Sequence, residues 1–378
     1  MNAAAAVTSS LDLLDAYDSV AALRRAVLAA RPAFDPARLT RLAILGAGPE
    51  GRRLAACCAA RGIEVVAVFD GNATKRGMPF GTCRVMPSDA LGSLDRSVPV
   101  IVASHRVLGA IDLLAGLGFE AAPFALLQLL DPEAFPPHMF YTAMLEDLHA
   151  NRARYRALAA SLADDESRRV LDRVLAYRLS MDPRVMREAI DWDLYCGSGL
   201  FEFGTDEVYV DGGSFDGDSV RLFIEHVGGK FSRALAFEPD PATFERLCAS
   251  FANEPRVQTH NCGLHRQQGE LRFDNDSTRG AIFSDTGSVV VPVVGLDEVL
   301  AGQRVSFIKM NIEGSELEAL RGAALSIASF RPKLAISAYH RPSDLWQIPE
   351  LVRSLHADYH LYLRQHDGGV IETVLYAC

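Results

Sequence analysis

The residues best suited to chemistry follow two short apolar segments in the second half of the chain. The stretch VYVDGGSFDGDS at 208–219 is typical of a buried strand, a glycine-rich turn and the start of a helix. Further along, ALAFEPD is a second apolar strand that ends in Glu238. Glycine lets a turn pass close to a ligand because it has no Cβ. An acid at the tip of the next strand can accept hydrogen bonds from both hydroxyls of a ribose. Together they predict a pocket for a nucleoside-bearing cofactor.

The composition of the turn narrows the choice of cofactor. Its sequence, D-G-G-S-F-D-G, differs from the G-x-G-x-x-G turn that cradles a pyrophosphate. A turn that holds no phosphate favours S-adenosylmethionine, whose ribose carries an amino-acid arm. The alternative is an ordinary strand, turn and helix of an α/β protein with no ligand.

Composition limits the class of protein. The 378 residues are enough for two or three domains. With 49% hydrophobic and 23% charged residues, the chain is typical of a globular enzyme. A net charge of −10 argues against a nucleic-acid partner or an anionic membrane surface. No stretch has the uncharged length needed for stable membrane insertion.

The N-terminus and the cysteines indicate a cytoplasmic protein. The first twenty residues carry acids and no basic region, unlike a secretory signal. The seven cysteines are odd in number and show no C-x-x-C spacing. We therefore expect reduced thiols and no metal site.

A second glycine turn lies near the N-terminus. After a helix expected at 10–30, within an N-terminal helical segment at 1–38, the segment at 41–70 has the pattern strand, turn, helix, strand. Its turn is a G-x-G-x-x-G, and its second strand ends in an acid; these residues are Gly46, Gly48, Gly51 and Asp70. With further strands expected at 98–104 and 118–124, the pattern predicts a small, mostly parallel Rossmann-like α/β domain over 39–130.

Three interpretations of this second turn are open. NAD is one, but no Tyr-x-x-x-Lys or similar hydride-transfer partner follows the turn. The segment LGAGPEGRRLAA with GIEVVAVFDGNATKRGMPFGTCRVMPSDAL resembles the nucleotide-sugar-binding domain of bacterial sugar acyltransferases. That resemblance implies a nucleotide or nucleotide-sugar site. The third reading is a domain used only for packing or for the contacts of a homodimer.

The remaining sequence predicts a helical connector and a larger α/β domain. Residues 131–205 show helical periodicity with charges on one face. Residues 206–378 contain seven strand patterns separated by helices, with an inserted hairpin at 269–294. Seven strands with a hairpin-like last pair match a class I methyltransferase, which is Rossmann-like with a seven-stranded mixed sheet.

Six motifs in this region resemble, in order and spacing, those of the FkbM-type methyltransferases. They are VDGGSFDGDS, AFEPDPATFERL, VVGLDEVL, FIKMNIEGSELEALRGA, RPKLAISAYH and ETVLYA. The upstream DDESRRVLDRVLAYRL resembles the helical segment that often precedes that domain, so the resemblance covers roughly 160–378. It implies S-adenosylmethionine-dependent O-methylation, often of hydroxyls in sugars, glycans or secondary metabolites.

The resemblance also assigns residues to the cofactor. The methionine arm is expected to lie on the first motif, at Asp211, Gly212, Gly213 and Ser214. The ribose is expected at Glu238 and its neighbour Pro239. The adenine is expected near the end of the third strand, at Asn261 and Cys262.

The fourth motif brings Lys309, Asn311 and Glu313 to the expected active site. The family pattern has an aspartate where this chain has Asn311. An amide cannot act as a base and is a poorer metal ligand, which argues against a metal-assisted mechanism.

Methyl transfer needs a base near neutrality, and two residues at strand ends are candidates. We predict His340, which closes the strand AISAYH, with Glu313 as the alternative. His340 could also only cap a strand or orient a loop, and His265 is a further candidate.

Two functions from different classes follow. One is an O-methyltransferase with a small-molecule or glycan acceptor. The other, kept open by Asn311, is a non-catalytic nucleotide-sugar-binding or scaffold protein whose methyltransferase domain has lost activity.

Overall fold

The chain forms two compact units, each built from segments that are distant in sequence. The computed structural model describes residues 9–196, 199–273 and 289–378. The first unit comprises the described residues up to Ala157 together with Arg169–Ile190 and Asp367–Ile371. The second comprises Leu158–Arg168, Asp191–His366 and Glu372–Cys378 without the gaps. The segment 131–205 is thus shared between the units, and the division at 38, 130 and 205 stays a prediction.

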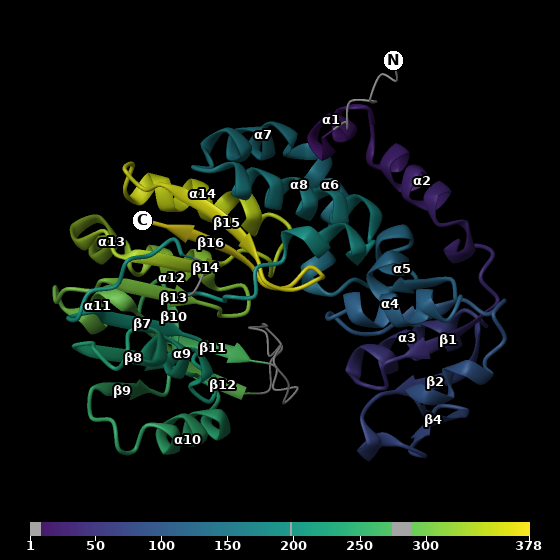
Figure 1. The fold of residues 1–378 in the computed structure, drawn as a ribbon, viewed down its shortest axis with the longest axis horizontal. Coiled ribbons are helices and arrows are strands. Elements are labelled where there is room, and N and C mark those ends of the chain that lie inside the picture. The colour runs from purple at the N-terminus through teal and green to yellow at the C-terminus, as the bar shows by residue number, and fades with distance from the viewer. Residues whose placement is uncertain (1–8, 197–198, 274–288) are drawn as a thin grey trace. The chain divides into compact units, whose positions relative to one another are not determined.

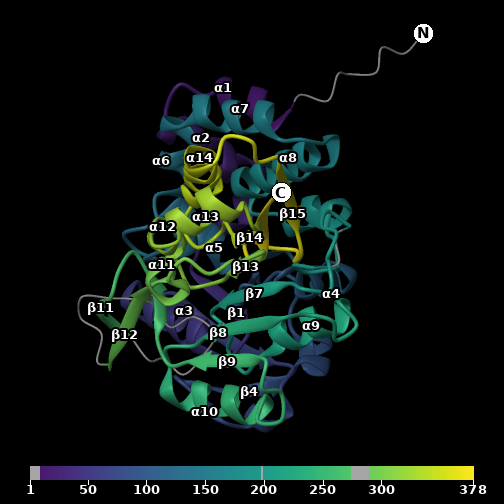
Figure 2. The same cartoon turned by 90° about the vertical axis from the view of Figure 1, so that its left-hand side faces the viewer.

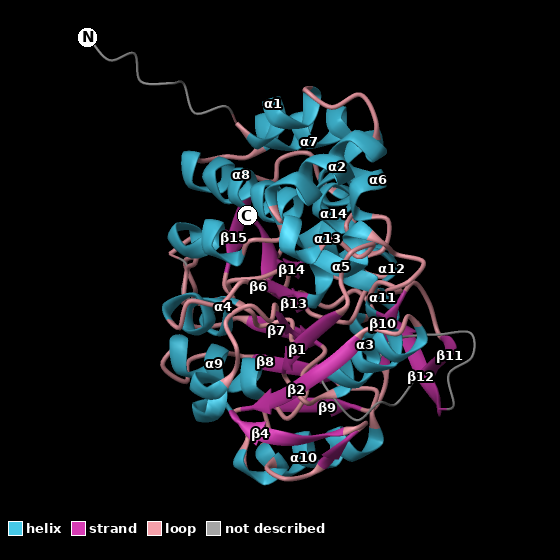
Figure 3. Ribbon diagram, turned by 90° about the vertical axis from the view of Figure 1, so that its right-hand side faces the viewer, coloured by secondary structure: helices cyan, strands magenta, loops and turns pink. Residues whose placement is uncertain are grey.

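The first unit contains a six-stranded sheet of order β3-β4-β2-β1-β5-β6 (Figure 3). Its strands are β1 Arg41–Leu45, β2 Glu64–Asp70, β3 Pro79–Phe80, β4 Cys83–Pro87, β5 Val100–Val102 and β6 Ala121–Pro123. All neighbours are parallel except β3, which runs antiparallel to β4. The predicted mostly parallel sheet is therefore confirmed. The short pair β3 and β4 was not expected, because two and five residues carry too little periodicity to be recognised.

Helices of the N-terminal half differ from the prediction at one place. The helices are α1 Ser10–Asp15, α2 Val20–Ala30, α3 Pro49–Ala60, α4 Leu108–Gly116, α5 Phe124–Leu130, α6 Met144–Ala150, α7 Arg152–Ser161 and α8 Asp165–Ser180. The single helix expected at 10–30 is wrong, because it is two helices, α1 and α2. Ser19 begins the second one: its hydroxyl accepts a hydrogen bond from the backbone N–H of Ala22, which satisfies a free donor of the first turn.

The second unit contains the predicted seven-stranded mixed sheet, in the order β15-β16-β14-β13-β7-β8-β9 (Figures 1 and 2). Its strands are β7 Val208–Gly212, β8 Arg233–Phe237, β9 Val257–His260, β13 Phe307–Met310, β14 Lys333–Ser337, β15 Leu361–Gln365 and β16 Thr373–Ala377. Strand β16 is antiparallel to both of its neighbours, and the other pairs are parallel. This order places β13 in the middle of the sheet and β7 beside it.

A smaller three-stranded sheet holds the predicted hairpin. Strands β11 Gly269–Phe273 and β12 Val289–Gly295 pair antiparallel, and β10 Gly263–His265 pairs parallel with β12. The two strands of the hairpin are confirmed, and the segment that connects them lies outside the described residues.

The helices of the second unit follow the strands closely. They are α9 Asp218–His226, α10 Pro241–Ser250, α11 Leu296–Leu300, α12 Glu316–Arg321, α13 Ala324–Phe330 and α14 Asp344–Leu355. Gly322 and Ala323 separate α12 from α13. No helix in the described parts of the chain is long and apolar enough to cross a bilayer.

Aromatic side chains fix the middle strands of this sheet. The ring of Tyr209 on β7 stacks on Phe223 of α9 with 4.4 Å between centroids, and on Phe307 of β13 with 4.9 Å. All three residues are fully buried. Stacked aromatic pairs add about 0.5–1.5 kcal/mol beyond their area burial. This packing fixes β7 and β13 side by side, and so positions the polar residues that follow their carboxyl ends.

Candidate functional site

The strand register gathers the predicted site residues at one edge of the seven-stranded sheet. Gly212 at the end of β7 pairs with Phe237 of β8 and with Met310 of β13. The next residues of these strands therefore emerge side by side. Ligands of open α/β sheets bind at the carboxyl ends of the strands.

The glycine turn is shaped by the chain's own backbone. Gly213 has φ +76°, a conformation that L side chains rarely adopt, and a Cβ there would lie 2.0 Å from the carbonyl oxygen of Asn311. The backbone N–H groups of Gly213 and Ser214 both donate to the carbonyl of Phe237, at 3.1 and 2.9 Å. Glycine at 213 is thus needed for the close approach of β7 to the end of β13.

Asp211 and Lys309 form a buried ion pair beneath the turn. The Lys309 Nζ lies 2.8 Å from Oδ1 of Asp211, and both side chains are almost fully buried. The same ammonium donates to the carbonyl oxygens of Gly213 at 3.0 Å and Gly212 at 3.3 Å. The other oxygen of Asp211 accepts from the hydroxyl of Ser219. This geometry favours a supporting role for both residues, whereas the sequence predicts catalysis for Lys309 and cofactor contact for Asp211.

Glu238 faces the turn from the end of β8. Its Oε2 accepts from the backbone N–H of Phe215 at 3.0 Å, and its Oε1 accepts from Asp240 at 2.9 Å. Burial raises the pKa of Glu238 to about 7, although the two N–H donors act to lower that pKa. A buried carboxyl that spans from a strand end to the glycine turn is placed where the sequence predicts a ribose.

The remaining predicted cofactor residues surround Glu238. Asn261 donates through Nδ2 to the carbonyl oxygens of Glu238 and Pro239, at 2.9 and 3.3 Å, and so fixes this turn. Cys262 is partly exposed, and burial raises the pKa of its thiol. The hydroxyl of Ser214 donates to the carbonyl of Asp211 at 2.9 Å and is fully buried. Their contacts with a cofactor stay predictions.

Asn311 lies between two tyrosine hydroxyls. Its Nδ2 donates to the hydroxyl of Tyr195 at 3.2 Å, and its Oδ1 accepts from the hydroxyl of Tyr339 at 3.2 Å. Burial raises the pKa of both tyrosines, and the carboxylate of Glu372 adds to the effect. Both phenols therefore keep their protons at neutral pH. The amide is oriented from both sides.

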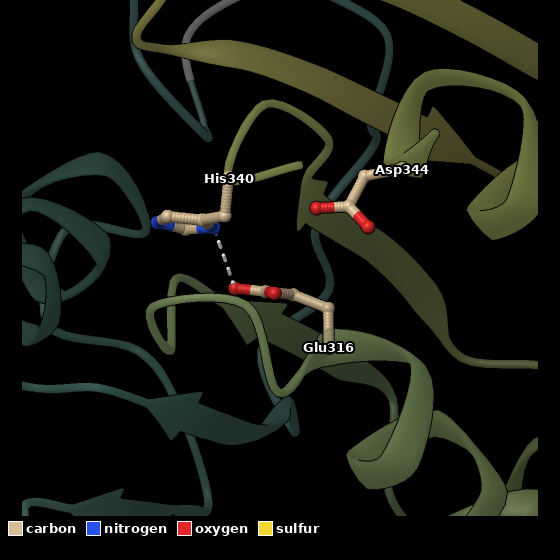
Figure 4. A group of neighbouring side chains, drawn as sticks. All are labelled: Glu316, His340 and Asp344. Carbon is tan, nitrogen blue, oxygen red and sulfur yellow. Dashed lines mark ion pairs between the residues drawn. The ribbon is translucent and has the colours of Figure 1, made fainter. Parts of the chain in front are cut away.

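His340 lies between two carboxylates. Its Nδ1 is 3.0 Å from Oε1 of Glu316, and its Nε2 is 3.5 Å from Oε2 of Glu313 (Figure 4 shows the first pair). Burial alone would lower the pKa of His340, but the carboxylates of Glu316 and Glu313 outweigh it and raise that pKa to about 9. The ring is fully buried. A buried imidazole that holds its proton at neutral pH is poorly placed to act as a base.

Glu313 is the more accessible of the two predicted bases. Its side chain is 27% exposed, and burial raises its pKa above the ordinary value. Its backbone has φ +54°, which costs free energy in a residue other than glycine. The geometry therefore favours Glu313 over His340 for proton transfer, and both roles stay predictions.

Backbone strain gathers around this edge of the sheet. Tyr195, Phe215 and Glu372 share the positive φ of Glu313, at 63°, 49° and 63°. Strained residues persist where the surrounding structure over-determines them, as at functional sites. Sequence reasoning missed Tyr195, Glu316 and Glu372. Only Glu316, in the motif NIEGSE, carried a local signal, because its spacing from Glu313 places it on the adjoining helical turn.

The second glycine turn, in the first unit, is tied down by its own acid. Asp70 Oδ2 accepts from the N–H of Ala47 at 2.8 Å and from Lys75 Nζ at 2.9 Å. A Cβ at Gly51 would lie 2.0 Å from the carbonyl of Gly46, whereas nothing lies within 4 Å of one at Gly48. Gly46 and Gly51 thus serve close packing, and a nucleotide at this turn stays a prediction.

Residues 211–368 are similar to known methyltransferases. Residues 211–368 match the family model of the methyltransferase FkbM domain. The crystal structure of methyltransferase FkbM from Methylobacillus flagellatus KT is similar over 96% of this chain and 98% of that one, with a TM-score of 0.74 and 28% identity. The fold is therefore that of an FkbM methyltransferase structure, and the predicted FkbM resemblance is confirmed for residues 211–368.

Two further relatives match part of this region. Methyltransferase 1 of Beauveria bassiana is 28% identical over 152 residues, which are 32% of this chain and 59% of that protein. The hexuronic acid methyltransferase AglP of Haloferax volcanii is 30% identical over 105 residues, which are 26% of this chain and 44% of that protein. The chain thus spans about half the length of these relatives. The resemblance of residues 39–130 to sugar acyltransferases stays a prediction.

Proposed function

We propose that this protein is an S-adenosylmethionine-dependent O-methyltransferase that acts on a hydroxyl of a sugar, glycan or secondary metabolite. The observation that carries the proposal is the placement of Glu238 opposite the glycine turn, within a domain that matches the FkbM model. An ordinary strand, turn and helix would not require a carboxylate buried against the turn.

The residues at the strand ends fit the cofactor. A carboxylate offers about four lone-pair sites, and the two backbone N–H donors use one on each oxygen of Glu238. The remaining sites suit a ribose diol. The turn from Asp211 to Ser214 would lie along the amino-acid arm, and Asn261 and Cys262 would lie beside the adenine. The buried Lys309 fixes the turn by holding the carbonyls of Gly212 and Gly213.

Bound S-adenosylmethionine would supply an electrophilic methyl group whose sulfur leaves as a neutral thioether. The protein's own tasks are to align the acceptor oxygen and to remove its proton. Alignment alone can lower the barrier by several kcal/mol. Glu313 would take the proton, since its carboxylate is partly exposed at the end of β13 while His340 is buried behind it. Tyr195 and Tyr339, fixed by Asn311, would line the acceptor side.

A sugar hydroxyl is the acceptor class best supported by the comparisons. One relative acts on a hexuronic acid by its name, although the match covers 44% of that protein. The polar groups beside Asn311 are phenol, amide and carboxylate, which can hydrogen-bond several hydroxyls.

A methyl-transfer assay tests the proposal. Labelled S-adenosylmethionine is incubated with a panel of nucleotide sugars and glycans, including hexuronic acids. We expect label in an acceptor with wild-type protein, and its loss in Glu313→Gln while cofactor binding persists. The matched control is Glu245→Gln, an exposed carboxylate on α10, which should transfer as wild type does. Full transfer by Glu313→Gln would remove Glu313 from the mechanism.

The second candidate is a nucleotide-sugar-binding or scaffold protein with an inactive methyltransferase domain. Asn311 favours it, because an amide stands where the family pattern has an aspartate. The assay separates the two functions through Asn311→Asp. If the site is active as it stands, this variant should gain no activity, because the added charge would fall beside Glu313 and Glu372. Transfer by Asn311→Asp alone would support the degenerate domain.

A further inference from the structure

A second cluster of ionisable side chains lies behind Glu313. It comprises Glu316, His340 and Asp344, which are 1%, 0% and 1% exposed. Glu316 is the first residue of α12, His340 follows β14, and Asp344 is the first residue of α14. Figure 4 shows the three side chains pointing toward one another, with an ion pair between Glu316 and His340. Three separate elements therefore direct potential metal ligands toward one point.

The spacing of these groups suits a metal ion. One donor atom from each residue lies within 4.8 Å of the others. Some point therefore lies within about 2.8 Å of all three atoms (4.8 Å divided by √3), so small side-chain shifts would reach the ~2.0–2.2 Å of nitrogen and carboxylate ligands. Nδ1 of His340 and Oε1 of Glu316 are already 3.0 Å apart, a normal separation for two ligands of one ion.

One oxygen of the cluster lacks a protein partner. Oε1 of Glu316 accepts from the backbone N–H of Ile312 at 2.8 Å. Its Oε2 is buried and has no hydrogen-bond partner among residues 9–196, 199–273 and 289–378. A buried carboxylate oxygen left without a donor costs free energy, because it has lost its water. This atom points to a group that is bound there.

The charges of the cluster are also unbalanced. Glu313, Glu316 and Asp344 are three carboxyls, and they share a single imidazole. The guanidinium of Arg341 donates to the carbonyl of Gly314 and acts on Asp344 only through space, whereas its backbone N–H donates to Asp344 at 2.7 Å. A divalent cation would relieve this excess of buried negative charge.

We propose that Glu316, His340 and Asp344 bind one divalent first-row transition metal ion through one nitrogen and two carboxylate groups. An imidazole ligand favours such ions over Mg²⁺ or Ca²⁺. Histidines that bind metals usually donate their other ring N–H to a carboxylate, and Nε2 of His340 faces Oε2 of Glu313 at 3.5 Å. The ion would thus fix the ring that orients Glu313. The site goes beyond the proposed function, because methyl transfer as described needs no metal.

Binding of Mn²⁺ tests the site without any activity assay. Mn²⁺ is the suitable probe because the seven cysteines are free, and thiolates bind Mn²⁺ poorly compared with carboxylate sites. The full chain is stripped with a chelator, its fold is checked by circular dichroism, and free Mn²⁺ is titrated by electron paramagnetic resonance. We expect one bound ion per chain. Glu316→Gln and Asp344→Asn, which change little but charge, should each weaken binding at least tenfold.

The matched control is Glu318→Gln. Glu318 lies on the same helix α12, but its carboxylate pairs with Arg266 and Arg321 at the surface. This variant should bind Mn²⁺ as the wild type does. The proposal is wrong if folded wild-type protein binds no Mn²⁺ in the micromolar range, or if Glu316→Gln and Asp344→Asn both bind it unchanged. Either failure leaves cofactor binding intact, so it is distinguishable from a failure of the proposed function.

Discussion

The buried ion pair beneath the glycine turn gives a sharp prediction for the substitution Lys309→Met. Methionine has a similar length and is apolar, so it removes the ammonium with little change of volume. Asp211 would then be a buried carboxylate without a cation, and the carbonyls of Gly212 and Gly213 would lose their donor. The structure therefore predicts that the variant is destabilised and that its turn is loosened.

The magnitude follows from the burial of the pair. Removing one partner of a buried ion pair costs about 3–5 kcal/mol, since it leaves an uncompensated charge. In the double variant Asp211→Asn, Lys309→Met no charge is left unpaired, and the remaining cost is that of unsatisfied hydrogen-bonding groups, about 1–3 kcal/mol. We therefore expect the double variant to be more stable than Lys309→Met alone.

Urea unfolding followed by fluorescence measures these differences. The control is Arg304→Met, which breaks the pair between Arg304 and Asp206 at 2.8 Å, where the side chains are 52% and 73% exposed. Exposed pairs contribute less than about 1 kcal/mol. A loss below about 1 kcal/mol for Lys309→Met, or a double variant less stable than it, would refute the supporting role of the pair.

Three further predictions concern single residues. Gly213→Ala should destabilise the second unit strongly, because its new Cβ would clash with the Asn311 carbonyl in addition to the strain of a positive φ. The control is Gly228→Ala, which has φ +58° and open space around the Cβ and therefore carries only the backbone strain of ~1–2 kcal/mol. Equal urea midpoints for the two variants would contradict the clash. The affinity for S-adenosylmethionine, measured by calorimetry, should rise as the pH increases through about 7, where Glu238 ionises. This pH dependence should be absent in Glu238→Gln and present in the exposed control Glu245→Gln. A wild-type affinity that does not change with pH would contradict the ribose role of Glu238. Native Glu238 keeps a proton that the unfolded chain releases near pH 4.5, so its contribution to stability falls between pH 4.5 and about 7. Asp70→Ala should lower the free energy of unfolding by about 1–3 kcal/mol, because the N–H of Ala47 and the ammonium of Lys75 lose their acceptor. The exposed control Glu133→Ala should lower it little. Equal losses in urea unfolding would contradict the structural role of Asp70.

The sequence was a good guide where the signal is local. The seven strands of the second unit were predicted, because each is a short apolar run that can be recognised within a few residues. Glu238 was predicted because it follows one of these strands directly and precedes a proline. The break between α1 and α2 was missed, because the apolar spacing continues past Asp15, where α1 ends, and past Ser19, which caps α2.

Residues joined by long-range pairing could not be assigned from sequence. Lys309 was expected in catalysis because it precedes Asn311 in its motif, but the register of β7 with β13 turns it toward Asp211. Tyr195 reaches Asn311 from 116 positions away and belongs to no recognisable pattern. His340 was predicted as a base from its place at a strand end. Its burial between Glu313 and Glu316 depends on the packing of α12 against α14, which one sequence does not reveal.

Calorimetry of S-adenosylmethionine binding tests the central claim most directly, since it requires no knowledge of the acceptor. We predict one bound cofactor per folded wild-type chain. Loss of even one charge-assisted hydrogen bond, about 1.5–3 kcal/mol, should make Glu238→Ala at least tenfold weaker. The exposed Glu245→Ala should bind as the wild type does. Absence of binding to folded wild-type protein would contradict the proposed function, and unchanged binding to Glu238→Ala would contradict the site on which it rests.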